Sequence, residues 1–499
     1  MAADTLIQLA LILPTLGAIG IGLCWWNRNL RETVTLVTAV GLFWLVVINL
    51  LPMVYAGERP EWAALEVVKG VSIAFKIEPL GMLFGAIAST LWIVNSIYSI
   101  GYMRGNSEPR QTPFYVCFAV AIASAIGIAF SANLFTLFLF YEILTVSTYP
   151  LVAHKGNGEA RDKARIYLVL LMATSMVLLL PAIVWTYVAA GTAEFAAGGI
   201  LAGAGLSGIA LTVLYTLYVY GIGKAALMPV HFWLPAAMVA PTPVSALLHA
   251  VAVVKAGVFC VIKITVYVFG LDLLTETGAS DVVAYLAGFT VVAASLVALT
   301  QDNLKKRLAY STVSQLSYVI LAAAIATPLA IIGAAMHILA HAVSKITLFF
   351  GAGCIYTAAH LTEVSQLDGI GRRMPITLGA FFIGAVSIIG LPPLIGVWSK
   401  WQIGVGAAAT DPWVVAVLMI SSLLNVAYLM PIIGRGFFRP LPDVPDGDPV
   451  VRKEAPLACL IAISITAGLC FGLFFAANEI QALLQPIVDV PVTGGGDAN

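Results

Sequence analysis

Residues 227–250, LMPVHFWLPAAMVAPTPVSALLHA, are apolar enough to lie in a membrane, yet they contain four prolines. Proline lacks a backbone N–H and breaks an α-helix, and in lipid the carbonyl groups that it frees need water or polar side chains as partners. A second stretch, residues 388–401 with the sequence IIGLPPLIGVWSKW, has the same character. The two stretches predict helices interrupted at membrane depth, a pattern typical of inverted repeats with an ion site at the midplane.

Long apolar segments make up the rest of the chain. Of its 499 residues, 61% are hydrophobic and only 10% are charged, which is far from the composition of soluble domains. A membrane-spanning helix needs about 20 apolar residues, and long uninterrupted runs exclude a β-barrel, whose strands alternate. We predict an all-α polytopic membrane protein without a cleavable signal peptide. Fourteen spans are expected, at residues 4–26, 33–55, 80–102, 114–131, 133–153, 165–190, 207–230, 243–269, 282–300, 311–327, 330–357, 375–409, 413–437 and 456–477.

Lysine and arginine are distributed unevenly between alternate loops. If the N-terminus lies outside, the inner loops hold 17 of the 25 Lys and Arg residues and the outer loops hold three, while Lys263 lies near the outer end of its helix. Inner loops of membrane proteins carry such an excess of positive charge. We therefore expect both termini outside the cytoplasmic membrane of a bacterium or an archaeon.

Five charged residues remain deep within apolar spans: Glu142, Lys224, Lys255, Lys345 and Lys400. Each costs about 2.5–3.5 kcal/mol at the bilayer centre, so such residues usually face one another, water or a partner protein. Two structural alternatives are snorkelling near a helix end, which is most plausible for Lys224, and an ion pair that holds helix register. Glu142 is too deep for a short carboxylate to snorkel.

Histidines extend this set of polar groups. His337, His341 and Lys345 are spaced at i, i+4 and i+8 and therefore share one stripe of a helix. His249 precedes Lys255 by six residues and projects from a different side of its helix. Lys and His suit proton relays because their pKa values respond to burial and to nearby charges, although a lone buried His is more often structural. These residues predict a proton relay, with His249 and His337 as further candidates to line it.

The other functional signals are negative. The six cysteines lie in apolar spans without CxxC spacing, so we expect no disulfide framework, metal site or iron–sulfur cluster. We also expect no cofactor and no nucleic-acid partner, because the chain has neither a dinucleotide or haem motif nor a basic run.

Five stretches are similar to one protein family. The chain resembles the antiporter-like subunits shared by respiratory complex I, Mrp-type cation/proton antiporters and membrane-bound hydrogenases, over about residues 70–440. The matching stretches are FYEILTVSTYPLV, GKAALMPVHFWLPAAMVAPTPVSALLHAVAVVKAG, QDNLKKRLAYSTVSQLSYV, MHILAHAVSKITLFFGAG and DGIGRRMPITLGAFFIGAVSIIGLPPLIGVWSKW.

The resemblance implies fourteen helices with two inverted five-helix repeats, each containing one broken helix. It places an N-terminal three-helix segment at residues 1–110, the repeats at 111–270 and 271–440, and the last helix and tail at 441–499. It also implies roles in proton movement. Glu142 resembles the family's essential glutamate, Lys224 its partner on a broken helix, Lys255 the next relay residue and Lys400 the terminal one, while His341 and Lys345 resemble members of the central polar axis.

The chain's length and number of spans fit the D-type Mrp protein and the equivalent subunits of complex I or hydrogenases, and its short tail argues against the longer relatives. Two departures, GVWSK in place of GF[FW]SK and TVSTYPLV after the glutamate, leave the charged residues untouched. The expected function is proton translocation within a multi-subunit complex, coupled to Na⁺ or K⁺ antiport or to redox chemistry in partner subunits.

Two alternatives remain open, namely a membrane component for inorganic-carbon uptake and an autonomous secondary transporter. The sequence does not indicate which complex contains the chain. It also leaves open which cation moves, and in which direction.

Overall fold

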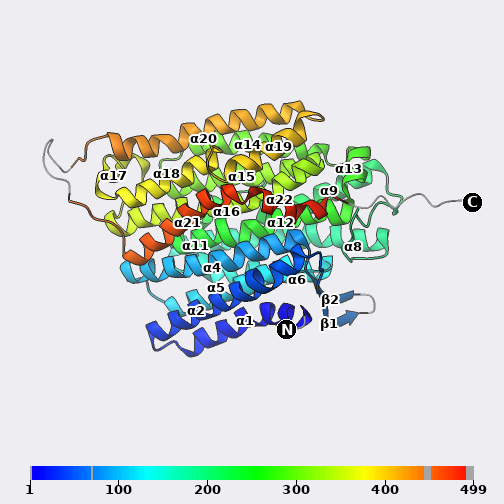
Figure 1. Ribbon diagram of the computed structural model, residues 1–499, viewed down its shortest axis with the longest axis horizontal. Coiled ribbons are helices and arrows are strands. Elements are labelled where there is room, and N and C mark those ends of the chain that lie inside the picture. The colour runs from blue at the N-terminus through cyan, green and yellow to red at the C-terminus, as the bar shows by residue number, and fades with distance from the viewer. Residues whose placement is uncertain (1–2, 69–70, 443–450, 490–499) are drawn as a thin grey trace, which may run out of the picture.

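The computed structural model describes residues 3–68, 71–442 and 451–489, and its helices lie side by side along the long axis of the molecule (Figure 1). In this part of the chain, 12 helical segments are long and apolar enough to cross a membrane, and Gly208–Gly221 and Pro375–Ile389 are shorter apolar helices. Together they account for the fourteen predicted spans. The prediction of an all-α polytopic membrane protein is confirmed.

The elements follow one another with short connections. In the first half they are α1 (Ala3–Leu23), α2 (Arg28–Phe43), η1 (Trp44–Leu50), α3 (Leu51–Tyr55), β1 (Glu61–Val68), β2 (Val71–Lys76), α4 (Pro79–Gly105), α5 (Gln111–Ala129), α6 (Leu134–Val152), α7 (Gly158–Thr174), η2 (Ser175–Leu179), α8 (Leu180–Ala190), α9 (Gly208–Gly221), η3 (Gly223–Ala225), α10 (Trp233–Ala236), η4 (Ala237–Val239), α11 (Thr242–Ala246), η5 (Leu247–Val251), α12 (Val253–Ile264) and η6 (Thr265–Phe269). In the second half they are α13 (Leu271–Thr277), α14 (Asp281–Thr300), α15 (Leu304–Ile325), α16 (Pro328–Ala359), η7 (Val364–Gln366), α17 (Ile370–Arg373), α18 (Pro375–Ile389), α19 (Gly396–Ala408), α20 (Pro412–Phe438), α21 (Leu457–Phe475), α22 (Ala477–Leu484) and η8 (Gln485–Ile487).

A β-hairpin at one end of the bundle was not predicted, because a search for long apolar windows passes over two short strands. β1 and β2 pair antiparallel, with Trp62 opposite Phe75 and their rings stacked 5.7 Å apart. The hairpin is attached to the bundle by the side chain of Asn133, which donates to the Ser72 carbonyl over 2.9 Å.

Two helices, α7 and α15, begin seven residues earlier than predicted, at Gly158 and Leu304. Composition alone assigns the charged residues in their first turns to loops. In the structure, the side chains of Asn157 and Asn303 cap these first turns by accepting backbone N–H groups over 2.8 and 3.1 Å. Asparagine is a favoured N-cap residue, so these caps explain the earlier starts.

The same hydrogen bond, from an asparagine to a glutamate side chain, occurs twice, at opposite ends of the bundle. We call it the clasp. Before α6, Asn133 donates to Glu194 over 3.0 Å, and before α15, Asn303 donates to Glu363 over 2.9 Å. Each pair also forms an isolated β-bridge. Asn133 lies at the start of α6. Asn303 lies at the other end of that helix, because it is close to Lys155, which comes just after α6 in the sequence. A clasp repeated with opposite orientation supports the two inverted repeats; the exact domain boundaries stay predictions.

Both predicted helix breaks are present, and the first begins earlier than expected. α9 ends at Gly221, so Lys224 lies in the short turn η3 and not six residues inside a helix. Residues 222–241 then form only short helical turns before α11. In the second break, α18 ends at Ile389 and α19 begins at Gly396.

Side chains take up the carbonyl groups that the breaks expose. Trp233 donates to the Gly223 carbonyl over 3.0 Å, and Tyr220 donates to that of Met228 over 2.9 Å. In the second break, the Lys400 amine donates to the Ile389 carbonyl over 3.0 Å. These side chains therefore supply partners for backbone groups that the breaks leave unpaired, as membrane depth requires.

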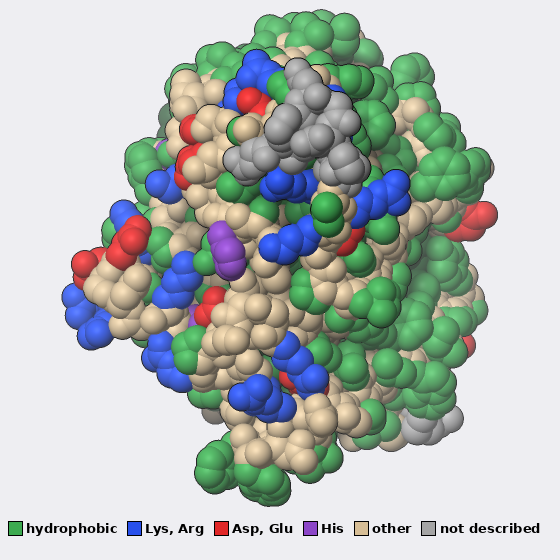
Figure 2. Space-filling view, turned by 90° about the vertical axis from the view of Figure 1, so that its left-hand side faces the viewer, with side chains coloured by type: hydrophobic (Ala, Val, Ile, Leu, Met, Phe, Trp, Pro, Cys, Tyr) green, Lys and Arg blue, Asp and Glu red, His purple; other side chains and the backbone are tan. Residues whose placement is uncertain are grey.

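Lysine and arginine side chains gather at one end of the molecule (Figure 2). Lys263 lies in the last turn of α12, near a helix end as predicted, and its side chain is completely buried. Its amine contacts the Glu78 carboxylate at 3.3 Å and donates to the Ser131 carbonyl over 2.6 Å. This pair joins α12 to the segment that connects the hairpin to α4.

Replacing Lys263 with methionine is expected to destabilise the fold by about 3 kcal/mol, because the Glu78 carboxylate would remain buried without a counter-charge. Thermal unfolding of the purified chain in detergent would show the loss as a lower Tm. Adding Glu78→Gln to the same chain should recover most of it. An unchanged Tm in the single variant would contradict a structural role for this pair.

Candidate functional site

The first part of the candidate site lies where α6 meets the broken helix. The Lys224 amine donates to the Tyr141 carbonyl over 2.9 Å and to the Thr145 hydroxyl over 2.5 Å, and it lies 3.1 Å from the centre of the Tyr141 ring. Lys224 is completely buried. The amine therefore sits against the turn of α6 that carries Glu142.

Glu142 occupies the outward side of this turn. Its two carboxylate oxygens are shielded but have no hydrogen-bond partner among the described residues. Ile143 and Val146 next to it on α6 are exposed, at 38% and 57%. Glu142 and Lys224 thus interact electrostatically through the turn, without the direct ion pair that would make the site purely structural.

The turn that carries Lys224 packs directly on α12. A Cβ atom added to Gly257 would lie 2.5 Å from the backbone carbonyl carbon of Lys224, so any larger residue would push the turn away. Lys255 lies two residues earlier on the same helix. The absence of a side chain at position 257 thus brings the two lysine-bearing segments together.

The centre of the site joins Lys255 to the histidines of α16. The Lys255 amine is hydrogen-bonded to His341 Nδ1. The rings of His341 and His337 stack 6.1 Å apart, and His337 Nδ1 lies 2.9 Å from the Ser399 hydroxyl. All four residues are buried. The histidine stripe therefore faces the lysine of the first half and the broken helix of the second.

Lys345 belongs to the same helix but forms a branch of the site. Its amine donates to the Ser311 hydroxyl over 2.6 Å, and that hydroxyl lies 2.7 Å from the Tyr428 hydroxyl. Its hydrogen bonds therefore point toward α15 and α20, and not along the stripe to His341.

Lys400 completes the site in the second break. Its amine lies 3.2 Å from the Ser422 hydroxyl and 5.1 Å from the centre of the Tyr318 ring. The Tyr318 ring also stacks on His337, with centroids 5.6 Å apart. Tyr318 thus connects His337 to Lys400, a role that the sequence reasoning missed. Its spacing from Ser311, on one face of α15, was the signal available.

Replacing Tyr318 with leucine is expected to slow proton movement about threefold to tenfold, because the amine of Lys400 loses its contact with an aromatic face and His337 loses its stacking partner. Tyr318→Phe keeps the ring and should retain most of the rate. Proton uptake by vesicles that contain each variant measures this. A normal rate in the leucine variant would remove Tyr318 from the site.

His249 lies in the π-helical turn η5, and both of its ring nitrogens are buried without a partner in the described structure. The Ser245 hydroxyl, one turn earlier, is also unpaired among the described residues, as are both polar atoms of the Gln315 amide. Buried polar groups almost always have partners, and ordered water commonly supplies them. Ordered water is therefore the expected partner of these groups.

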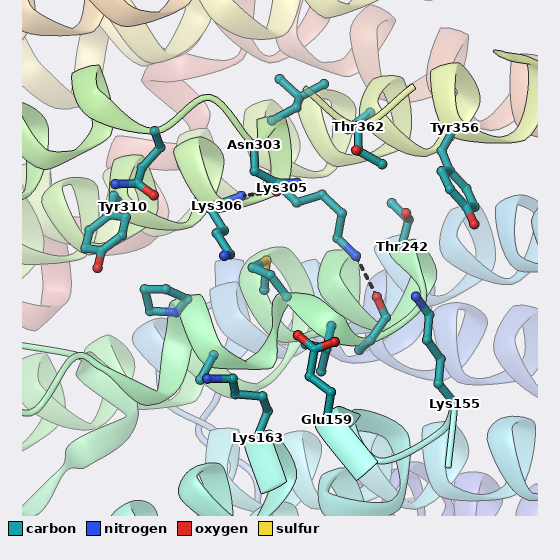
Figure 3. A pocket seen from close by; sticks show the side chains of 18 of the residues that line it. Lys155, Glu159, Lys163, Thr242, Asn303, Lys305, Lys306, Tyr310, Tyr356 and Thr362 are labelled. Atoms are coloured by element: carbon teal, nitrogen blue, oxygen red, sulfur yellow. Dashed lines mark hydrogen bonds between the residues drawn. The ribbon is translucent and has the colours of Figure 1, made fainter. Parts of the chain in front are cut away.

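A cavity of about 600 Å³ lies next to this segment of the chain (Figure 3). Thr242, three residues before Ser245, lines it. Among the described residues, four lysines line it as well, on opposite sides in the close-up, and only one acid does, Glu159; the lysines are Lys155, Lys163, Lys305 and Lys306. The inner cavity, as we name this space, is thus strongly positive.

Two titratable groups outside the spans lie close to these lysines. Burial raises the pKa of Glu108, although Lys155 and Lys305 oppose the shift. Burial, followed by the nearby Arg110 charge, lowers the pKa of His154 to about 4. His154 is therefore neutral at physiological pH and adds no positive charge near the inner cavity.

Comparison with known proteins places this arrangement in context. The model of the family described as NADH:quinone oxidoreductase/Mrp antiporter, transmembrane, matches residues 131–425. NADH-quinone oxidoreductase subunit N of Desulforudis audaxviator is 32% identical over 433 residues, which cover 83% of this chain and 85% of that protein. A probable K⁺/H⁺ antiporter protein of Rhizobium meliloti is 30% identical over 443 residues; the match covers 85% of this chain but only 43% of that longer relative.

Two solved structures share the fold along almost the entire chain. One is in the Mrp complex from a Dietzia species, with a TM-score of 0.84, 20% identity and coverage of 98% of this chain and 97% of that chain. The other is in the membrane-bound sulfane sulfur reductase, an archaeal respiratory membrane complex, with a TM-score of 0.83, 23% identity and coverage of 97% of both chains. At these identities, the likeness concerns the fold.

Proposed function

The chain belongs to the NADH:quinone oxidoreductase/Mrp antiporter family of membrane proteins, and from this premise we propose that it conducts protons within a multi-subunit membrane complex. The observation that carries the proposal is the buried series of contacts from Lys255 through His341, His337 and Tyr318 to Lys400. Every member of this series except Tyr318 exchanges protons readily near neutral pH when its surroundings change.

We propose that protons enter from the inner side through a hydrated passage between the inner cavity and His249. A proton arriving in the inner cavity passes Thr242 and Ser245 and reaches His249, whose two ring nitrogens have no partner among the described residues. From there the neighbouring buried bases are Lys345 on α16 and Lys255 on α12. Such a route requires neither a bound organic substrate nor a catalytic centre in this chain.

Glu142 and Lys224 form the regulatory end of the relay. Because the carboxylate lies on the outward side of α6 without a partner among the described residues, a charge or a protein that approaches this face changes its electrostatic effect on Lys224. Loss of this effect favours release of the proton that Lys224 holds. We propose that this step couples proton movement to a neighbouring subunit, which carries out cation antiport or redox chemistry.

Proton translocation in inverted membrane vesicles tests the proposal. Lys400→Met is expected to lower the rate about tenfold or more, because the end of the relay loses its exchangeable group. Lys453→Met removes an exposed lysine near the membrane surface and serves as the matched control. Vesicles are energised in turn with NADH and with a Na⁺ or K⁺ pulse. Equal rates in the two variants, with equal assembly, would contradict the proposal.

A further inference from the structure

We propose that the inner cavity is a binding site for an anionic phospholipid, whose headgroup phosphate lies among Lys155, Lys163 and Lys306 and whose acyl chain follows Ile166 and Phe232. The site has two parts of opposite character, a cationic part and an apolar part. It lies at the inner cavity, where the proposed proton path begins, and apart from the buried contacts that run from Lys255 to Lys400; lipid binding there can be measured without proton movement.

The cationic part has more lysines than acids, because four lysines on the cavity wall face Glu159 on that wall and Glu108 close to Lys155 and Lys305. Lys155, Lys163 and Lys306 have no ion-pair or hydrogen-bond partner for their amines in the described parts of the chain. Lys305 donates only to the Ala240 carbonyl, over 2.5 Å, within the same described residues (Figure 3). Glu159 is the single described carboxylate on the cavity wall. A negatively charged ligand would therefore supply a partner for amines that have none among the described residues.

The positions of these lysines favour a phosphate group. Lys155 and Lys163 come from the start of α7 and the loop before it, whereas Lys306 belongs to the first turn of α15 on the opposite side of the cavity (Figure 3). A phosphate between them would accept from amines on two sides, and the N-terminus of α15 adds a favourable dipole. Basic pockets between membrane helices on the cytoplasmic side commonly bind lipid headgroups.

The apolar part identifies the ligand as a lipid and not a free phosphate. Ile166 and Phe232 line the same cavity and are 42% and 57% exposed. They lie where α7 and α10 meet, and Val169, one turn further along α7, is 66% exposed. A soluble phosphate would leave these side chains uncovered. The acyl chain of a phospholipid would cover them while its headgroup remained with the lysines.

Lipid binding to the full chain, purified in its complex and delipidated in detergent, tests the inference. Native mass spectrometry counts retained phosphatidylglycerol and phosphatidylcholine for the wild type, for Lys155→Gln/Lys163→Gln/Lys306→Gln, and for a control triple variant, Arg28→Gln/Arg372→Gln/Lys453→Gln. The control removes the same charge from exposed positions elsewhere. We expect wild type and control to retain phosphatidylglycerol selectively, and the lysine variant to bind it about tenfold more weakly or worse.

Two further arms distinguish the source of the phosphate and keep the inference falsifiable. Phe232→Ser should weaken phosphatidylglycerol binding, whereas millimolar glycerol 3-phosphate or inorganic phosphate should not displace the lipid. Displacement by either soluble phosphate would overturn the assignment to a lipid. Equal lipid retention by the lysine variant and the control triple variant would overturn the site itself.

Discussion

Lys255→Met is expected to reduce proton translocation by the complex to less than about a hundredth of the wild-type rate, the scale on which a positioned proton-transfer group contributes. The Lys255 amine is hydrogen-bonded to His341 and is therefore the contact between the two halves of the relay. Methionine keeps the length and apolar packing of the side chain but cannot hold a proton. The reaction is measured as ΔpH formation in inverted vesicles.

The control for this variant must preserve the surroundings of Lys255. Lys263→Met/Glu78→Gln removes a buried lysine from the same helix together with its counter-charge, so it tests whether any lost lysine on α12 has the same effect. It should keep most of the rate. A normal rate in Lys255→Met, in a complex that assembles fully, would exclude Lys255 from the path.

Glu142→Gln is expected to lower coupled proton translocation about fivefold or more, because a charge that acts on Lys224 across a weakly polar interior is lost while the shape of the side chain is kept. Glu142→Asp retains the charge and should have a smaller effect. Assembly is checked by native gel, since the same side chain lies on the outward face of α6. Ser147→Ala, just over one turn later on that helix, is the matched control.

The outcome for Glu142→Gln separates two roles. If the carboxylate acts through its charge, the aspartate variant keeps substantial activity and the glutamine variant does not. Equal losses in both variants, with poor assembly, would instead make Glu142 a structural contact with a neighbouring protein of the complex. That result would contradict its role in the relay.

Most of the fold was accessible from the sequence, because lipid imposes simple rules of length and composition. All fourteen apolar spans and both breaks at proline-rich stretches were predicted correctly. The β-hairpin was missed, since its strands are too short for a hydropathy window. The starts of α7 and α15 were missed for another reason: their caps, Asn157 and Asn303, stabilise turns whose composition is that of a loop.

The site was only partly accessible, because sequence spacing fixes positions along one helix and not the contacts between helices. The histidine stripe on α16 could be predicted from its period, but its contact with Lys255 depends on how α12 packs. The same limit applies to Lys224, which lies in a turn rather than a helix, and to Lys345, which points toward Ser311. Tyr318 was missed because its spacing from Ser311 gives a face of α15 but not the contacts with His337 and Lys400 on other helices.

The most direct test of the relay compares wild-type, Glu142→Ala and Lys255→Ala chains in the intact complex, with ΔpH measured in inverted vesicles and assembly confirmed by native gel. We predict that both variants assemble but fail to generate a normal ΔpH under any driving reaction that the wild type uses. Normal proton coupling with normal assembly in both variants would contradict the account.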